Sequence, residues 1–409
     1  MKSFGLSLSG AFRGVRACEC GLRVVLLVVC CLLVAPAVVS GCALVREPVP
    51  RTVLALDAAK GNSRNSEGDF VVLNDGRIFF AYSRFIGGGG DDNDRCVIAA
   101  RTSSDRGETW SGDRIVARNE IDPKGNVMSV SLLRLRDGRL AMFYVCKTVA
   151  ANGKLSSKKL MRVSADEGES WGAARDITSA FPSAYRVLNN ARVIRLSSGR
   201  ILVPLSEHAN EKRNELNHHG RIICVYSDDD GWTWKMSAAV PQLKDGKGRD
   251  VIYQEPGVLE LKDGRVLVWF RTDAGWQWYS YSSDGGATWG EPTASSLRSP
   301  LSPASIFRRK SGDLICFWND HEGLADLQGK GPEWACGVRT PLTVGISTDE
   351  GLTWRRRNLE TGYDVKNPYR YWYCYTAMLE LDDRILAAYC AENSLHDLRI
   401  KSIPLSWLP

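Results

Sequence analysis

Short apolar runs alternate with polar turns through most of this chain, from about residue 50 to its end. The run Val71–Leu73 precedes Asp75, and the run Ile78–Phe80 follows Gly76, so an Asp-Gly turn separates two apolar segments. Asp-Gly in this setting is a strong signal for a β-hairpin. Turns of the same kind recur at residues 74–77, 136–139, 197–200, 262–265, 310–313 and 382–384. The pattern predicts strands joined by tight turns.

A second turn motif lies between these hairpins and fits S-x-D-x-G-x-[T/S]-W. We call it the Asp box. The Asp side chain caps backbone N–H groups, the Gly supplies a positive φ, and the Trp folds back as an apolar plug. Copies about 60 residues apart indicate a repeat protein. The five copies span residues 103–110, 164–171, 227–234, 282–289 and 347–354.

Together the two motifs predict a four-stranded antiparallel sheet in each repeat. There are six Asp-Gly-type turns but five Asp boxes, so the last repeat lacks its outer strand. The N-terminal segment 52–56 can supply that strand and close a ring, which removes the exposed sheet edge. We therefore predict an all-β fold, a single six-bladed β-propeller of four-stranded antiparallel blades over residues 51–409. A β-sandwich with two subdomains is the alternative, and the even period argues against it.

The N-terminus has a different composition. Three arginines precede the apolar run 24–39, which is the pattern of a secretory signal. The run ends in Val39-Ser40-Gly41-Cys42, which resembles a bacterial lipoprotein cleavage box with Cys42 as the lipidated residue. We expect a signal peptide over residues 1–41, a linker over 42–50, and an exported protein, either secreted or a lipoprotein of the cell envelope. An uncleaved membrane anchor is the alternative, because the run is nearly long enough to span a bilayer.

The charge and the cysteine content of the chain limit the classes of binding partner that we expect. The net charge is +6, and residues 1–41 carry four basic groups and one acid, which leaves +3 on the remainder. No Lys/Arg run suggests nucleic acid, and no Cys or His spacing suggests a metal site. We expect no cofactor, a monomer, and membrane contact only through the lipid anchor. Seven cysteines lie in the predicted propeller, mostly within apolar strand patterns, and we expect buried free thiols there. They are Cys96, Cys146, Cys224, Cys316, Cys336, Cys374 and Cys390.

The first strand of each repeat is expected to line the central channel. Residues about eight positions before and after each Asp-Gly turn then meet in one cup, given a rise of about 3.3 Å per residue. Arginines beside carboxylates suggest an anionic or polyhydroxylated ligand, and two tryptophans suggest stacking on a sugar. The alternative is that these residues only close the funnel through salt bridges. The candidate cup residues include Arg64, Glu67, Asp69, Asp92, Asp94, Ser129, Lys147, Asn190, Arg192, His208, Glu255, Arg271, Trp276, Trp278 and Tyr375.

The Asp boxes and the number of blades resemble the sialidase (neuraminidase) superfamily, over essentially all of residues 50–409. The resemblance implies a glycosidase that holds a substrate carboxylate with three arginines. It also implies a tyrosine nucleophile with a glutamate partner and an aspartate as acid/base. Glu255 in the run QEPGVLEL resembles the glutamate, and Tyr375 in the run CYTAM resembles the nucleophile.

Further residues follow from the same resemblance. Arg271 and Arg339 resemble the second and third arginines of the triad. Asp92 resembles the acid/base, with Asp94 as a close rival because the loop GGGGDDND gives no fixed register.

The sequence departs from the pattern of the family at the first arginine of the triad. Aligned on the turn at 75–76, its position falls on Glu67, and Arg64 and Arg192 are the candidates to replace it. Glu67 and Asp69 are expected on one face of the strand, since residues i and i+2 share a face. We predict that Glu67 is salt-bridged to a cup arginine, which takes that arginine away from the substrate.

Three functions are compatible with these residues. The first is an exported exo-glycosidase that removes terminal sialic acid or a related acidic sugar through a tyrosine nucleophile. The second is a glycosidase or lyase that acts on a uronic or neutral sugar, and the third is a glycan-binding propeller without catalysis.

Overall fold

The structure is a computed structural model that describes residues 48–149, 155–208, 219–323, 338–362, 370–391 and 396–409. The expected signal peptide and Cys42 lie outside these residues, and so does Cys336. Within the described ranges, no helix is long and apolar enough to cross a membrane.

The described chain is built almost entirely from antiparallel strands, which form six blades in sequence order. Blade 1 contains β2 (Arg64–Val72), β3 (Ile78–Phe85), β4 (Cys96–Ser103) and β5 (Arg114–Ala117). Blade 2 contains β6 (Asn126–Arg134), β7 (Leu140–Val149), β8 (Leu155–Ser164) and β9 (Arg175–Asp176). Blade 3 contains β10 (Tyr185–Val187), β11 (Ile194–Arg195), β12 (Ile201–His208), β13 (Gly220–Ser227) and β14 (Lys235–Met236).

The second half of the chain repeats the same plan. Blade 4 contains β15 (Gln254–Glu260), β16 (Val266–Arg271), β17 (Trp276–Ser282) and β18 (Thr293–Arg298). Blade 5 contains β19 (Ser305–Arg308), β20 (Leu314–Trp318), β21 (Leu342–Ser347) and β22 (Arg355–Glu360). Blade 6 contains β23 (Cys374–Glu380), β24 (Arg384–Ala391), β25 (Asp397–Pro404) and β1 (Arg51–Leu56), followed by the short 3₁₀ helix η2 (Leu405–Trp407).

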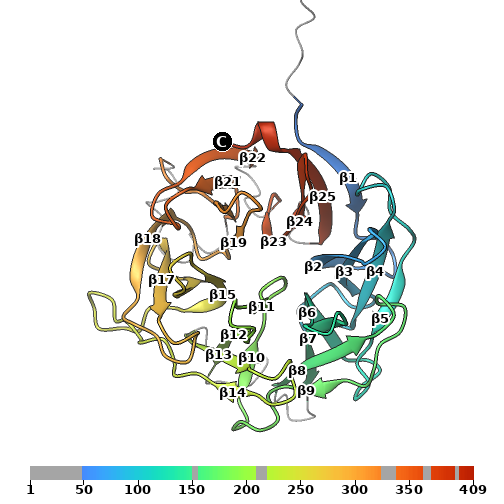
Figure 1. Cartoon of the computed structure of the whole chain (residues 1–409), viewed down its shortest axis with the longest axis horizontal. Coiled ribbons are helices and arrows are strands. Elements are labelled where there is room, and N and C mark those ends of the chain that lie inside the picture. Colours follow the sequence, from blue (N-terminus) through green and yellow to red (C-terminus); the bar gives the residue numbers. More distant parts are fainter. Residues whose placement is uncertain (1–47, 150–154, 209–218, 324–337, 363–369, 392–395) are drawn as a thin grey trace, which may run out of the picture. The chain divides into compact units, whose positions relative to one another are not determined.

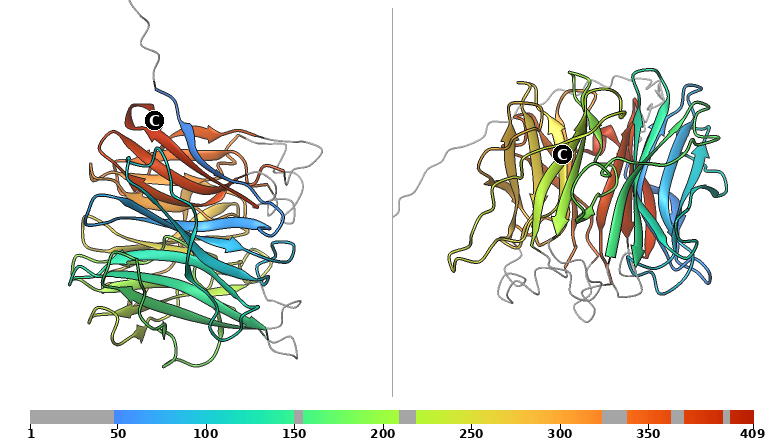
Figure 2. Two further views of the ribbon diagram at one scale, coloured as in Figure 1. Left: turned by 90° about the vertical axis from the view of Figure 1, so that its right-hand side faces the viewer. Right: turned by 90° about the horizontal axis from the view of Figure 1, so that it is seen from below.

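The blades form a ring around a central axis, with the first strand of each blade nearest the centre (Figure 1). A single parallel bridge between Cys96 and Asn126 joins the sheets of blades 1 and 2, which otherwise pair only within themselves. Seen from the side, the strands run across the thickness of the ring (Figure 2). The predicted all-β propeller is confirmed.

The ring closes as the sequence predicts. Strand β1 pairs antiparallel with β25, with Leu56 opposite Leu398, and so supplies the outer strand of blade 6. The first and last parts of the propeller therefore share one sheet.

Apolar side chains fill the spaces between neighbouring blades, so each sheet is buried on both faces. The Trp of each Asp box packs against one of these clusters, as predicted. Trp171 lies 6.4 Å from the ring of Phe79 in the preceding blade, and Trp234 lies 6.2 Å from Phe143. Every box therefore ties its own turn to the interface with the blade before it.

Each Asp box is held by a local hydrogen-bond network, which the third copy illustrates. The backbone N–H of Thr233 donates to Asp229 Oδ1 at 2.8 Å, and the Thr233 hydroxyl donates to Asp229 Oδ2 at 2.6 Å. The Ser227 hydroxyl donates to the same carboxylate at 2.8 Å and accepts the N–H of Gly231. Gly231 and the preceding Asp230 both have positive φ, of 87° and 58°, which is why a Gly recurs at this position.

The fourth Asp box yields a stability prediction. Burial alone raises the pKa of Asp284, but hydrogen bonds from Ser282 and Thr288 lower it to about 2. A carboxylate whose folded pKa lies below its unfolded value stabilises the fold above about pH 4, and this stabilisation is lost as the pH falls toward 2. We expect Asp284→Ala to lower the free energy of unfolding by roughly 1–2 kcal/mol at pH 7, the usual cost of a lost cap.

Thermal unfolding at pH 7 and pH 2.5 measures this effect. The difference in Tm between Asp284→Ala and wild type is expected to shrink at the lower pH. Glu291→Ala, an exposed carboxylate just after the box, is the control and is expected to unfold like wild type at both pH values. An equal difference at pH 7 and pH 2.5 contradicts the prediction.

Candidate active site

The innermost strands carry an irregularity at the same place in four blades. The pairing register shifts at residues 66–68, 128–131, 254–257 and 374–377, which marks a β-bulge in each strand. The residue in each bulge has a positive φ although it is not glycine: 49° at Glu67, 61° at Ser129, 50° at Glu255 and 59° at Tyr375. Ala191, in the break between β10 and β11, has φ 52°. Such conformations store strain and often mark functional positions.

Two of these bulges bring Tyr375 and Glu255 together. The Tyr375 hydroxyl donates to Glu255 Oε1 at 2.8 Å, across the channel from blade 6 to blade 4. The other carboxylate oxygen, Oε2, lies 2.9 Å from Arg271 Nη1, an ion pair that is not aligned as a hydrogen bond. Arg271 also donates to the side chain of Gln254. All three predicted residues therefore form one connected group.

Arg339 joins the same group from the loop before β21. Its guanidinium carbon lies 5.6 Å from the centre of the Tyr375 ring and 4.7 Å from that of Trp372. Its Nη1 donates to Cys374 Sγ at 3.1 Å. Its Nε is buried and has no hydrogen-bond partner in the described part of the chain. A buried guanidinium with an unused donor beside the tyrosine is suited to binding an anion.

Burial determines the protonation state of the tyrosine. It raises the pKa of Tyr375 well above the usual value, and Glu255 raises it further, although Arg339 and Arg271 act in the opposite direction. Tyr375 is therefore a neutral phenol in this structure, and the carboxylate that accepts its hydrogen bond is the natural recipient of its proton.

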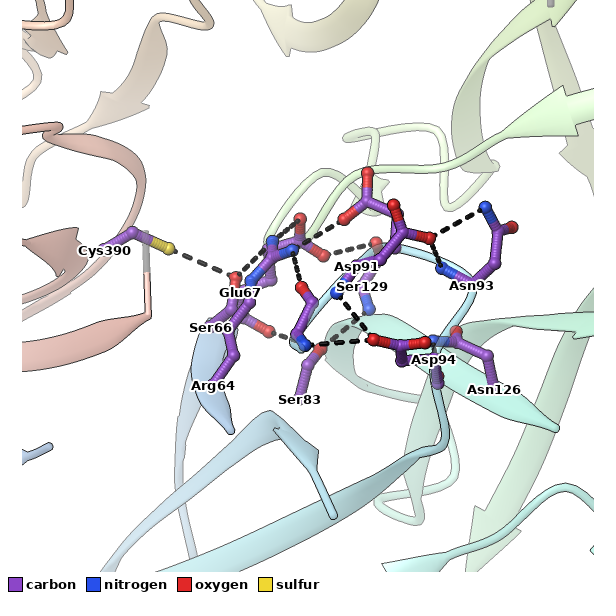
Figure 3. A network of polar contacts seen from close by, with 12 residues as sticks. Arg64, Ser66, Glu67, Ser83, Asp91, Asn93, Asp94, Asn126, Ser129 and Cys390 are labelled. Atoms are coloured by element: carbon purple, nitrogen blue, oxygen red, sulfur yellow. Dashed lines mark hydrogen bonds and ion pairs between the residues drawn. The ribbon is translucent and has the colours of Figure 1, made fainter. Parts of the chain in front are cut away.

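A second polar cluster lies on blade 1. It includes Arg64, one of the two candidates to replace the first arginine of the triad (Figure 3). Its Nη1 donates to Asp92 Oδ1 at 2.7 Å, and its Nη2 lies 3.6 Å from Glu67 Oε1. Glu67 is 4% exposed, and its other oxygen accepts a hydrogen bond of 2.6 Å from Ser129. The predicted salt bridge between Glu67 and a cup arginine is confirmed, and the partner is Arg64.

The structure separates the two candidate aspartates. Asp94 Oδ2 accepts the backbone N–H groups of Gly90 and Asp91 at 3.0 and 2.9 Å, so this carboxylate holds the loop together. Asp92 pairs with Arg64 instead, and 60% of its side chain is exposed. Desolvation by the surrounding protein raises the pKa of Asp92, but the positive charges of Arg64 and Lys147 outweigh this effect and lower the pKa to about 2.

Arg192 makes its side-chain hydrogen bonds to blade 5, although the charges of Glu255 and Tyr375 also act on it. Its Nη2 donates to the carbonyl of Ala304 at 2.6 Å and its Nη1 to the Ser305 hydroxyl at 3.2 Å, both on blade 5. Burial lowers the pKa of Arg192 to about 10. Its neighbour Asn190 donates to the carbonyls of Gly68 and Tyr375, at 2.8 and 3.0 Å, and so connects blade 3 to blades 1 and 6.

Asp69 does not share the environment of Glu67, contrary to the prediction that the two meet in the cup. Its oxygens accept the backbone N–H groups of Phe70 and Leu132, both at 2.8 Å, and burial raises its pKa to about 7. The bulge at residues 66–68 interrupts the alternation of faces on which that prediction depended. Asp69 joins blade 1 to blade 2.

The remaining candidates have contacts with other residues of the described chain. Trp278 packs against the apolar cluster between blades 3 and 4, and Trp276 is covered by Arg298, whose guanidinium carbon lies 4.7 Å from the ring. His208 is 5% exposed and lies 3.0 Å from the Ser206 hydroxyl.

Sequence reasoning missed three contributors to the site. Trp372 stacks on Arg339, Cys374 accepts its hydrogen bond, and Cys390 lies 3.2 Å from the Ser66 hydroxyl. Cys374 and Trp372 are close neighbours of Tyr375 in the sequence, and this proximity was the available signal. Cys390 had none, since it looks like an ordinary buried strand residue.

Comparison with known proteins shows the family to which the chain belongs. The model of the BNR repeat-like domain matches residues 80–385, about three quarters of the chain. The chain belongs to the BNR repeat-like family of the sialidase superfamily. Curated relatives of this family include the sialidase of Paraclostridium sordellii, 28% identical over 238 residues, and that of Clostridium perfringens, 28% identical over 235 residues. The matched regions cover 53% of this chain in both cases, and 55% and 58% of the two relatives.

Solved structures share the same fold at lower identity. A Hadza microbial sialidase has a TM-score of 0.66 and 19% identity, with 85% of this chain and 67% of that chain covered. The intramolecular trans-sialidase from Ruminococcus gnavus has a TM-score of 0.64 and 15% identity, with 87% and 97% covered. A protein of unknown function from Dyadobacter fermentans has a TM-score of 0.64 and 19% identity, with 87% and 100% covered. These likenesses support the propeller of the family.

Glu67 provides a prediction on the pH dependence of stability. Burial raises its pKa to about 7, against the opposing charge of Arg64 and together with the charge of Asp92. The folded chain therefore holds a proton that the unfolded chain releases above about pH 4.3, so stability falls between about pH 4 and pH 7. Glu67→Gln is expected to reduce that fall by on the order of 3 kcal/mol.

Urea unfolding of the variant and of wild type at pH 5 and pH 8 checks this expectation. Glu291→Gln, an exposed carboxylate, is expected to retain the wild-type difference between the two pH values. If Glu67→Gln loses as much stability as wild type between pH 5 and pH 8, Glu67 does not carry the proton.

Proposed function

We propose that this protein is an exported glycoside hydrolase that removes terminal sialic acid, or a related acidic sugar, from glycans. The observation that carries the proposal is the 2.8 Å hydrogen bond from the Tyr375 hydroxyl to Glu255. A tyrosine nucleophile suits an anionic sugar, because a carboxylate nucleophile would repel the substrate. The glycan is the expected partner, and the protein is proposed to act as a monomer.

In the proposed reaction, Glu255 takes the phenolic proton as the tyrosine oxygen attacks the anomeric carbon. The leaving oxygen receives a proton from an acid, and water later releases the sugar from the enzyme. The ion pair between Arg271 and Glu255 supports this scheme, since it orients the carboxylate toward the tyrosine. Asn190 supports it as well, because its hydrogen bond to the Tyr375 carbonyl holds the bulge in place.

The substrate carboxylate is assigned to Arg271 and Arg339. Both lie next to Tyr375, and guanidinium groups bind carboxylates through paired hydrogen bonds. Arg64 joins them in this proposal only when the substrate displaces Asp92, because in the present structure Arg64 pairs with Asp92 and Glu67.

Asp92 is proposed as the acid/base. In the present structure Arg64 keeps this carboxyl ionised, with a pKa of about 2. Asp92 therefore has to separate from Arg64 before it can carry a proton to the leaving group. A substrate carboxylate that competes for Arg64 would promote that separation.

The first test of the proposal is the hydrolysis of a chromogenic α-sialoside. Tyr375→Phe removes the attacking oxygen, and we expect kcat to fall by about 10³-fold or more. Tyr389→Phe is a matched control, because Tyr389 is also buried and also donates to a glutamate, Glu360, away from the cup. We expect that control to keep near wild-type turnover. No release of sialic acid by the wild type, or equal turnover by Tyr375→Phe, refutes the proposal.

A second candidate rests on Glu67. A buried carboxylate beside Arg64 weakens the attraction for an acidic sugar and favours a glycosidase or lyase that acts on a uronic or neutral sugar. At pH 8, where Glu67 is ionised, we expect Glu67→Gln to lower KM for an acidic sugar by about ten-fold, because Arg64 then has one negative partner fewer. The KM of a neutral glycoside should not change.

A substrate panel distinguishes the candidates. Turnover of a uronic-acid polymer with none of sialosides favours the second candidate, and saturable glycan binding without any turnover indicates a non-catalytic propeller. If Glu67→Gln leaves the KM of every acidic sugar unchanged, this position does not determine substrate choice.

The export route is part of the same proposal. The segment 1–41 is proposed to be removed as a signal peptide, with lipid attached to Cys42. Metabolic labelling with palmitate is expected to mark wild type but not Cys42→Ala.

A further inference from the structure

Cys374 and Cys390 face each other on neighbouring strands of blade 6. Cys374 opens β23, and its directly opposite residue in β24 is Cys390. Directly opposite residues in an antiparallel pair have Cα atoms about 4.5 or 5.5 Å apart, and a disulfide spans about 4.4–6.8 Å. Both thiols are free and buried, and together with Tyr375 they form a small cluster of their own. The spacing expected for this pair therefore lies within the range that a disulfide spans.

The thiol pair also connects the two arginine clusters. Arg339 Nη1 donates to Cys374 Sγ at 3.1 Å. On the other side, the Ser66 hydroxyl lies 3.2 Å from Cys390 Sγ and accepts a hydrogen bond of 3.0 Å from Arg64 Nη2 (Figure 3). A chemical change at either sulfur therefore acts on an arginine of the site.

The two sulfurs differ in reactivity, which depends on the thiolate form. Burial alone raises the pKa of Cys390, but the Cys374 thiol, the charge of Arg64 and the Ser66 hydroxyl together lower it to about 6. Burial raises the pKa of Cys374 well above the usual value. Cys224, buried without such neighbours, has a raised pKa as well. Cys390 is thus the attacking sulfur, and Cys374 is the resolving one.

We propose that Cys374 and Cys390 are an oxidation site, which a hydroperoxide closes to a disulfide directly beside Tyr375. The Cys390 thiolate attacks a peroxide oxygen and breaks the O–O bond, which gives a sulfenic acid and hydroxide. The Cys374 sulfur then displaces the sulfenic hydroxyl and releases water as the S–S bond forms. In total, two thiols lose two electrons and two protons, and one hydrogen peroxide becomes two waters.

The disulfide alters the site through Arg339. It replaces the thiol that accepts the Arg339 hydrogen bond, and it joins the strand that carries the Tyr375 bulge to β24. Misplacing catalytic groups by about 1 Å costs up to 10²-fold in rate, so we expect turnover of the oxidised protein to fall at least about ten-fold. This effect on turnover rests on the proposed function, whereas the formation of the disulfide does not.

Peptide mapping tests the disulfide in the full-length protein. The protein is treated with hydrogen peroxide, alkylated, and digested with trypsin, which cleaves after Arg384 and so separates the two cysteines. We expect a linked pair of peptides, 371–384 with 385–399, that disappears after dithiothreitol. Cys374→Ser is expected to give no linked pair and a sulfenic or sulfinic acid at Cys390. Cys224→Ala, which changes a buried thiol elsewhere, is expected to form the link as wild type does.

Alkylation of both residues after peroxide treatment, or a sulfinic acid at Cys390 of the wild type without a link, overturns the proposal. Turnover is measured in the same samples, and each variant is compared with its own reduced form. A linked protein that keeps full turnover overturns the effect on Arg339. A reduced protein that hydrolyses no glycoside refutes the proposed function instead, and the mapping then still decides whether the oxidation site exists.

Discussion

The propeller depends on the burial of every blade between two neighbours. The sheets are apolar on both faces, as in β3, where almost every residue is buried, so a single blade has no stable surface to show to water. Closure of the ring by β1 and β25 is therefore required by the same burial that makes the blades. In the described chain, the inner side of the innermost strands is a surface that carries polar groups, among them the pair of Tyr375 and Glu255.

Bulges on the innermost strands turn that surface into a site. A non-glycine residue with positive φ costs about 1 kcal/mol or more, and the packed ring holds several of them at matching positions. A glycine follows Glu67 and Glu255 within two residues and makes room for each bulge. A Cβ at Gly68 would lie 2.4 Å from the Phe80 ring, and one at Gly257 would lie 2.1 Å from Trp269. The glycines thus let the strands carry Glu67 and Glu255 in conformations that regular strands do not provide.

Much of this architecture could be predicted because turn chemistry is local. Asp boxes and Asp-Gly turns depend on residues within a few positions of each other, and the missing outer strand followed from counting them. The grouping of Glu255, Arg271, Arg339 and Tyr375 came from their resemblance to one family and their order along the chain.

What could not be predicted depended on the path of the backbone. The bulge beside Glu67 changes which face of the strand Asp69 occupies. The alternation of apolar and polar residues gives no sign of this bulge. The choice between Asp92 and Asp94 depended on which carboxylate the loop uses for its own N–H groups. The pairing of Cys374 with Cys390 required the strand register itself.

The segment 190–192 has a consequence for the shape of the substrate. Asn190 binds blades 1 and 6, the N–H of Ala191 binds the Val130 carbonyl on blade 2, and Arg192 binds blade 5. Five of the six blades thus meet at three residues of the described chain, just before β11, which lies near the centre of the ring (Figure 1). Under the proposed function, a polysaccharide that followed the axis would meet this hydrogen-bonded segment, so the glycan is expected to enter and leave by the same mouth. The proposed hydrolase is therefore expected to act on the tips of branched glycans and not on the interior of long polymers.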